Sequence, residues 1–219
     1  MKKVGFILII VFLLSISIVS AHLPRLVYNL DLNKDPWIIK NPEISQAFYG
    51  NLKGIPDYYI INSDKEFELY VGILSPDINR ADKDFSVEIY SKEGNYTLNG
   101  LNFTWKSFYE EFGGDNYFSG PEIDKNVSAG EYIIKVYSPD NQGKYSLAIG
   151  KIESFTFSET IKTYIKLPLM KSQFFEKSPL TAYFNILGIF LLVMIVSIVV
   201  IVLILRWIIK KVMKKNKKR

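Results

Sequence analysis

The sequence predicts a mainly β protein: an antiparallel β-sandwich, then a helix beside the membrane, then one membrane-spanning helix at the C-terminus. Three observations carry this prediction. Short apolar or alternating segments recur about every ten residues between residues 44 and 149, with turn residues between them, which is typical of an antiparallel sandwich. The twenty residues Ile186–Leu205 are apolar apart from one serine and contain no charge. The chain then ends in a basic run without any acid.

The strand pattern begins with two short apolar runs, 26–28 and 37–39. Prolines surround them, so we predict edge strands, because proline is tolerated at the edge of a sheet but not in its middle. Further along, residues 85–90 alternate cleanly between apolar and polar side chains. The main predicted strands are 47–52, 58–61, 67–74, 85–90, 131–137 and 144–149. An acidic loop, 75–84, precedes the fourth of these, and a turn at 138–143 joins the last two.

The order of glycines, tyrosines and apolar residues in these strands resembles a known family. Gly-x-Leu-x-Gly and Asp-Tyr-Tyr come first, and Ala-Gly-x-Tyr-x-x-x-Val-Tyr and Gly-x-Tyr-x-Leu close the series. The residues are Gly50, Leu52, Gly54, Asp57, Tyr58, Tyr59, Val87, Ile89, Tyr90, Gly94, Ala129, Gly130, Tyr132, Val136, Tyr137, Gly143, Tyr145 and Leu147. Over residues 45–150 the chain is similar to the bacterial pre-peptidase C-terminal domain, a jelly-roll-like β-sandwich appended to many secreted enzymes.

This resemblance implies a jelly-roll-like, non-catalytic binding or accessory module, stabilised in some members by calcium. The chain departs from the family pattern in two ways. No protease accompanies the domain in this sequence, and residues 101–121 form an insertion.

The C-terminal apolar stretch has the length of a membrane span. At about 1.5 Å per residue, a twenty-residue helix is roughly 30 Å long, the thickness of the hydrocarbon core of a bilayer. Eight Lys and Arg follow it, and cations gather on the cytoplasmic side of a span. We predict a transmembrane helix over 179–209, a basic cytoplasmic tail over 210–219 and a main domain, 22–152, outside the cytoplasm at the cell membrane.

The N-terminus has the pattern of an export signal over residues 1–21. Lys2 and Lys3 precede an apolar run, and Val19-Ser20-Ala21 offers the small residues that a signal peptidase reads. Cleavage after Ala21 makes His22 the first residue of the mature chain. The alternative is an uncleaved anchor, which gives the protein two spans.

Charge is segregated along the chain. Of the 27 Lys and Arg, two lie in the signal and eight in the tail, which leaves 17 between His22 and Leu205 together with all 22 Asp and Glu, a net charge of −5. The basic residues occupy membrane-topology positions, so we expect no nucleic-acid partner. The absence of cysteine excludes disulfides, thiol nucleophiles and thiolate metal sites.

The insertion 101–121 carries the candidate ligand-binding residues. Four of its aromatic residues recur at helical spacing, which predicts a short helix packed over the end of the sandwich. An exposed aromatic row instead suits stacking on a sugar ring or a partner surface. The sequence leaves both interpretations open. The helical spacing joins Trp105, Phe108, Tyr109 and Phe112, and the ligand-binding candidates are Trp105, Phe108, Tyr109 and Tyr117.

Residues 153–178 predict a juxtamembrane amphipathic helix. Ser158 offers a cap, Ile161 and Ile165 lie one turn apart, and Pro168 is expected to interrupt the helix. Four lysines suit anionic headgroups, which places the segment on the membrane surface. The alternatives are a linker or a helix packed on the sandwich. The lysines are Lys162, Lys166, Lys171 and Lys177.

No standard catalytic set can be assembled, so we expect no enzyme. His22 is the only histidine, which argues against a Ser-His-Asp triad or a histidine-based zinc site. Glycoside hydrolysis requires one pair of carboxylates. The sequence offers pairs such as Glu110 with Glu111 or Asp82 with Asp84, but their spacing does not single out any one pair. We expect no obligatory cofactor.

Two metal sites are hypotheses. An N-terminal His22 supplies an α-amino nitrogen and Nδ1 as a bidentate unit for Cu(II). One acidic loop supplies the oxygen ligands that Ca²⁺ prefers, although its spacing matches no EF-hand. The metal candidates are His22, Asp77, Asp82 and Asp84.

These patterns predict a membrane-anchored extracytoplasmic binding or accessory module that contacts the lipid bilayer and a protein or glycan partner. The alternative is an exported copper-binding protein that uses His22.

Overall fold

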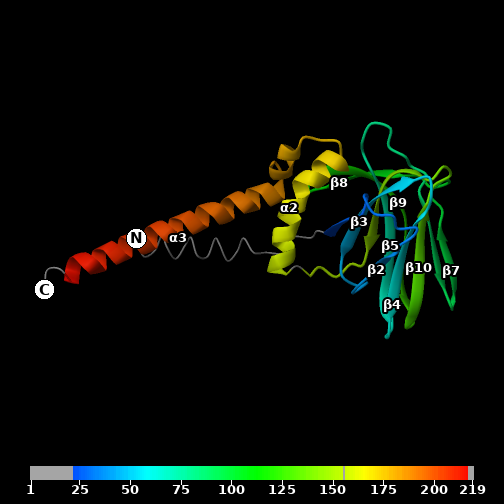
Figure 1. Cartoon of the computed structure of the whole chain (residues 1–219), viewed down its shortest axis with the longest axis horizontal. Coiled ribbons are helices and arrows are strands. Elements are labelled where there is room, and N and C mark those ends of the chain that lie inside the picture. Colours follow the sequence, from blue (N-terminus) through cyan, green and yellow to red (C-terminus); the bar gives the residue numbers. More distant parts are fainter. Residues whose placement is uncertain (1–21, 155, 217–219) are drawn as a thin grey trace. The chain divides into compact units, whose positions relative to one another are not determined.

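The computed structural model describes residues 22–154 and 156–216, so the predicted signal, 1–21, and the end of the tail, 217–219, lie outside the described residues. The described residues divide into two units, 22–182 and 183–216. Two sheets, of six and five strands, form the first unit (Figure 1). The six-stranded sheet has the order β1-β3-β11-β5-β9-β8, and the five-stranded sheet has the order β2-β4-β10-β6-β7. The strands are β1 (Leu23–Leu26), β2 (Trp37–Ile39), β3 (Gln46–Lys53), β4 (Asp57–Ser63), β5 (Phe67–Pro76), β6 (Ser86–Ser91), β7 (Gly94–Leu98), β8 (Lys106–Glu110), β9 (Asp115–Val127), β10 (Gly130–Tyr137) and β11 (Gln142–Ile149).

The hydrophobic core lies between the two sheets. Along β4, the first half of β5 and β10, alternate residues face inward and are buried, as the period of two along a strand requires. The predicted β-sandwich is therefore confirmed. Its two N-terminal strands are edge strands, as expected, but β1 pairs with β3 and β2 with β4 in parallel rather than antiparallel register. Inward residues include Phe48, Leu69, Val71 and Leu147 from the six-stranded sheet, and Tyr59, Ile61, Val87 and Ile134 from the five-stranded sheet.

Several residues that carry the family resemblance meet inside this core. Gly50 and Tyr145 are cross-strand partners on β3 and β11, and a Cβ atom at Gly50 would overlap the ring of Tyr145. The hydroxyl of Tyr145 donates to Oδ2 of Asp57 at 2.6 Å and lies 2.7 Å from the hydroxyl of Tyr59. These side chains are buried, so this part of the pattern serves folding rather than ligand contact.

The helix predicted for the aromatic insertion is wrong. Residues Lys106–Glu110 form β8, which pairs with β9 in antiparallel register. Pairing of the backbone with a neighbouring strand outweighs the local side-chain spacing, because tertiary context overrides helix propensity.

The longest strand, β9, has no counterpart among the predicted strands. Its pairing with β5 shifts register between Gly72 and Leu74, opposite Gly120 and Pro121. Such a bulge reverses the alternation of inward and outward residues, and glycine and proline mark it. The sequence pattern of β9 is therefore irregular although the strand is thirteen residues long.

Helix α2 (Phe157–Gln173) begins at the N-cap Thr156, whose side chain forms a capping box with Glu159. The expected cap at Ser158 is therefore wrong by two residues. The expected interruption at Pro168 is also wrong, since the helix continues to Gln173. Burial of Leu167 and Met170 on both sides of the proline offsets the loss of its N–H donor.

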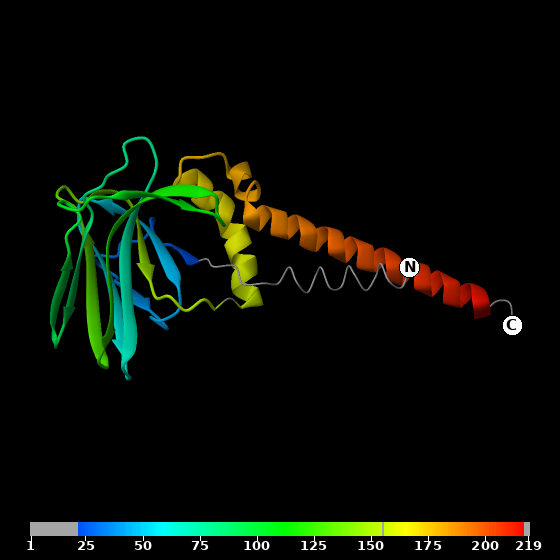
Figure 2. The ribbon, with the colours of Figure 1, turned by 180° about the vertical axis from the view of Figure 1, so that it is seen from behind.

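α2 packs on the outer face of the six-stranded sheet, beside the sandwich in Figures 1 and 2. The ring of Phe174 meets Tyr49 at 4.9 Å, and the ring of Phe175 meets Tyr117 at 5.2 Å. Of the three interpretations of this segment, the structure shows the helix on the sandwich. The aromatic cluster consists of Tyr49, Tyr117, Phe174 and Phe175.

An ion pair is buried in the same layer. Lys171 and Asp115 are each 1% exposed, and the Nζ atom of Lys171 lies 2.5 Å from Oδ2 of Asp115. Lys177 holds the other carboxylate oxygen at 2.9 Å. Burial lowers the pKa of Lys171, and the hydrogen bond that Lys171 donates to Asp115 opposes this shift. The expectation that Lys171 faces anionic headgroups is wrong, because its charge is neutralised inside the protein.

The second unit contains the long C-terminal helix. A short 3-10 helix, η1 (Pro179–Tyr183), precedes α3 (Ile186–Asn216), so the helix itself begins seven residues after the start of the predicted span. The side chain of Asn185 accepts a hydrogen bond from the amide of Gly188 at 2.9 Å and caps α3. Among the described residues, the segment Gly188–Lys214 of α3 is the one candidate span, and 6% of its most apolar part is buried.

Candidate functional site

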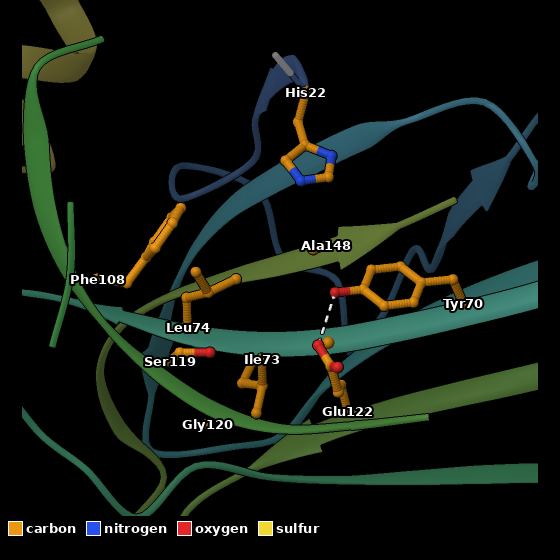
Figure 3. A pocket seen from close by; sticks show the side chains of 10 residues that line it. His22, Tyr70, Ile73, Leu74, Phe108, Ser119, Gly120, Glu122 and Ala148 are labelled. Carbon is orange, nitrogen blue, oxygen red and sulfur yellow. Dashed lines mark hydrogen bonds between the residues drawn. The ribbon is translucent and has the colours of Figure 1, made fainter. Parts of the chain in front are cut away.

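A hollow of about 210 Å³ lies on the outer face of the six-stranded sheet. Its floor is formed by small residues on three neighbouring strands, β5, β9 and β11, and these leave room that larger side chains would fill. Figure 3 shows the larger side chains that stand around it. The small residues are Gly72, Ser119, Gly120 and Ala148, and the larger ones are His22, Tyr70, Ile73, Leu74, Phe108 and Glu122.

The hollow combines an apolar side with a polar side. Phe108 of β8 and Leu74 of β5 supply apolar surface, and Phe108 is 45% exposed. On the polar side the hydroxyl of Tyr70 donates to Oε2 of Glu122 at 2.9 Å (Figure 3). Burial, followed by this hydrogen bond, raises the pKa of Tyr70, so the phenol stays protonated and remains a donor near neutral pH. The apolar ring of Phe108 and the hydrogen-bonded carboxylate of Glu122 thus line the same small hollow.

The bulge in β9 shapes the floor. Gly120 lies under the indole ring of Trp105, and a Cβ atom at this position would stand 2.6 Å from the ring. Only glycine allows this approach. The indole N–H of Trp105 donates to the carbonyl of Gly100 at 2.9 Å, and the ring packs against the core. Trp105 therefore supports the hollow from behind and does not line it.

The structure separates the four aromatic candidates. Phe108 lines the hollow, and Tyr109, its neighbour on β8, is 56% exposed but does not. Tyr117 is buried beneath α2, with its hydroxyl 3.1 Å from that of Tyr49. Of the two interpretations that the sequence left open, core packing describes Trp105 and Tyr117, and exposure describes Phe108 and Tyr109.

His22 stands at the edge of the hollow, at the start of β1. Its Nδ1 atom hydrogen-bonds with the hydroxyl of Ser45. Desolvation by neighbouring protein atoms lowers the pKa of the imidazole, and Glu153 opposes this shift, so the ring is neutral near pH 7. The copper hypothesis requires Nδ1 as a ligand, and this atom is already engaged.

The acidic metal candidates lie elsewhere in the sandwich. Asp82 is close to Gly143, the second residue of β11. Burial, followed by the charges of Asp82 and Asp140, raises the pKa of Asp84, and one buried oxygen of Asp84 has no hydrogen-bond partner within the described structure. Asp77 is exposed after β5. Across residues 22–154 and 156–216, no three His, Asp or Glu side chains converge as metal ligands would.

Sequence reasoning missed most of the hollow. Tyr70 and Leu74 alternate with the buried residues of β5, and this period-two pattern marks them as outward-facing. Glu122 carries no such signal, because it follows the bulge in a strand that was not predicted. The small residues form a floor only because β5, β9 and β11 are neighbours in the sheet, which the sequence does not show.

No protein-family model and no curated protein matches the sequence. Among solved structures, the pre-peptidase C-terminal domain of a collagenase from Bacillus anthracis matches 61% of this chain and 98% of its own, at 13% identity and a TM-score of 0.29. The module CBM35 from Cellvibrio japonicus Abf62 matches 46% of this chain and 70% of its own, at 15% identity and a TM-score of 0.28. A Xyl-CBM35 in complex with a glucuronic-acid-containing disaccharide matches 48% and 74%, at 14% identity and a TM-score of 0.29.

The resemblance predicted from residues 45–150 thus has a structural match at low sequence identity. At such identities the likeness is one of fold, and the fold itself follows from the strand pairing described above.

Proposed function

We propose that this protein is a single-pass membrane protein whose sandwich acts outside the cytoplasm as a non-catalytic binding or accessory module for a protein or glycan partner. Helix α3 is the observation that carries the proposal. Its 27-residue segment Gly188–Lys214 is long and apolar enough to cross a membrane, and almost none of its most apolar part is buried in protein. A helix of this kind in water would expose its whole surface unfavourably.

The distribution of charge supports the proposed orientation. The exported part carries a net charge of −5, and the eight cations after Leu205 have no acid among them. Because the chain lacks cysteine, single cysteines can report topology. In intact cells a membrane-impermeant maleimide is expected to label Glu93→Cys, in the exposed turn between β6 and β7, and not Met213→Cys, near the end of α3. The reverse labelling pattern would contradict the orientation.

The hollow supports the proposed binding role. Its 210 Å³ is below the roughly 300–1,000 Å³ of pockets that enclose a small molecule, so it suits one ring or one side chain of a larger partner. Phe108 offers a surface for a ring, while Glu122, Tyr70 and Ser119 offer hydrogen-bonding groups. Hydrolysis of a glycoside by two carboxylates needs a second acid, and Glu122 is the one carboxylate that lines the hollow in the described structure.

Two neighbouring residues make a matched test of this role. A photoreactive phenylalanine analogue at position 108 or 109, in the full chain in its native membrane, reports what touches each position. For a protein partner, we expect an adduct with one protein at position 108 and none at position 109. For a glycan partner, we expect an oligosaccharide to bind the protein in nanodiscs, and this binding to be lost in Phe108→Ala but kept in Tyr109→Ala. Equal behaviour of the two positions would contradict the hollow as the binding site.

A further inference from the structure

The face of α2 that points away from the sandwich is apolar along its length. Ile161, Ile165 and Leu169 recur every four residues and are 45%, 68% and 49% exposed. At this spacing they form one stripe, opposite the buried side chains of Leu167 and Phe174. A contiguous exposed apolar surface marks an interaction site in most soluble domains. Docking of α2 on the sandwich leaves this stripe unexplained.

Two cations lie beside the stripe. Lys162 is exposed, and neither it nor Lys166 forms an ion pair with any residue that the structure describes. Glu159 is the only acid in the helix, and it pairs with Arg25 at 3.3 Å. This surface is therefore cationic and apolar, whereas the exported part as a whole is acidic. Anionic headgroups above acyl chains are the complementary surface.

The chain also limits how far the stripe can be from a bilayer. Residues 174–185 separate α2 from α3. Fully extended, they would reach about 40 Å at 3.3–3.6 Å per residue. Phe174 and Phe175 are held on the sandwich, which shortens this reach. If α3 spans the membrane, α2 remains close to the surface of the same membrane.

We propose that the stripe of α2 lies in the interfacial region of the outer leaflet, with Lys162 and Lys166 against anionic headgroups. The protein then contacts the membrane at two places, the span and the stripe, and α2 carries the sandwich on its other face. This inference rests on the proposed function, because it requires α3 to be in the membrane. It replaces the set of four lysines expected from the sequence with two, since Lys171 and Lys177 bind Asp115.

The test uses the full chain in phosphatidylcholine vesicles with and without phosphatidylglycerol. An environment-sensitive fluorophore is attached to single cysteines in Ile165→Cys, in Glu93→Cys as a solvent control and in Val199→Cys as a control for the span. We expect lipids spin-labelled near the headgroup to quench the label at 165 several-fold more than the label at 93. Lys162→Glu combined with Lys166→Glu is expected to reduce this quenching, most in vesicles that contain phosphatidylglycerol.

The controls keep the two proposals apart. A label at 199 that acyl-chain quenchers do not reach would overturn the membrane anchor itself. A label at 199 inside the bilayer, with a label at 165 that behaves like the label at 93, would overturn the interfacial stripe alone. Efficient oxidation of Ile165→Cys to a disulfide-linked dimer, without lipid quenching, would assign the stripe to a second copy of the chain and also overturn the proposal. Position 165 is exposed, so the substitution is not expected to affect folding.

Discussion

Two layers of the sandwich unit each bury one carboxylate, and the groups that hydrogen-bond with the carboxylate differ between the layers. The inner layer, between the two sheets, buries the carboxylate of Asp57, and the outer layer, between the six-stranded sheet and α2, buries that of Asp115. Asp57 is bonded by the neutral hydroxyl of Tyr145, and burial raises its pKa to about 6. Asp115 is bonded by two lysines. The buried carboxylate of the inner layer is thus held by a neutral hydroxyl, and that of the outer layer is held by an ion pair.

The largest expected effect comes from breaking that pair. Lys171→Met leaves Asp115 with one partner in a buried site and is expected to lower the free energy of unfolding by about 3–5 kcal/mol. Lys177→Met is the matched control, because Lys171 still holds Asp115, and we expect about 1 kcal/mol or less. Denaturant unfolding of the full chain in detergent measures both. Equal losses in the two variants would show that the outer layer does not depend on the buried pair.

The inner layer is expected to be most sensitive at Gly50. In Gly50→Ala the new methyl group would overlap the ring of Tyr145, and overpacking of this kind costs about 1–3 kcal/mol. Gly72→Ala, also on a strand of the six-stranded sheet, is the control. Its Cβ atom would meet the hydroxyl of Tyr70 at 3.1 Å, a side chain that can move, so a smaller loss is expected. Thermal unfolding distinguishes the two, and a larger loss at Gly72 would contradict this account of the core.

Titration of Asp57 is expected to make the free energy of unfolding fall as the pH rises. Its pKa is raised in the folded state, so its contribution to stability is fully present below about pH 4 and is lost as the pH rises through about 6. Asp57→Asn cannot titrate. We expect the stability of this variant relative to the wild type to improve by about 2–3 kcal/mol between pH 4 and pH 7. Denaturant unfolding at several pH values measures the difference, and a constant difference would place Asp57 in a wetter environment.

The smallest expected effect compares one hydroxyl in each layer. Tyr117→Phe removes the hydrogen bond to Tyr49 at 3.1 Å and is expected to cost about 1 kcal/mol. Tyr145→Phe leaves both Asp57 and Tyr59 without their shared partner, so a cost of about 1–3 kcal/mol is expected. The same unfolding measurement ranks the pair. A reversed ranking would mean that the outer layer, rather than the inner one, holds the tighter hydrogen-bond network.

Several of the predicted strands have a regular period of two, and the strands that sequence reasoning misses, β8 and β9, do not. Alternate residues are buried along β4, along the first half of β5 and along β10, so the patterns of these strands are visible in the sequence. The sequence predicts a helix at β8 because the aromatic residues there also fit a period near four. β9 was missed because its bulge reverses the pattern in mid-strand. Of the site, Phe108 and His22 were among the candidates, and the floor was not, since glycine and alanine carry no chemical signal of their own.

The sequence by itself determined the strand-rich sandwich, the apolar C-terminal helix and the segregation of charge, because hydrophobic period, length and charge are properties of neighbouring residues. Only the tertiary structure decided which side of each segment is covered. Lys171 is buried because α2 meets β9, Tyr117 is buried because Phe175 reaches it, and Phe108 is open because it lies beside small residues of other strands. The first two contacts join residues 56 and 58 positions apart in the sequence, and no local pattern records them.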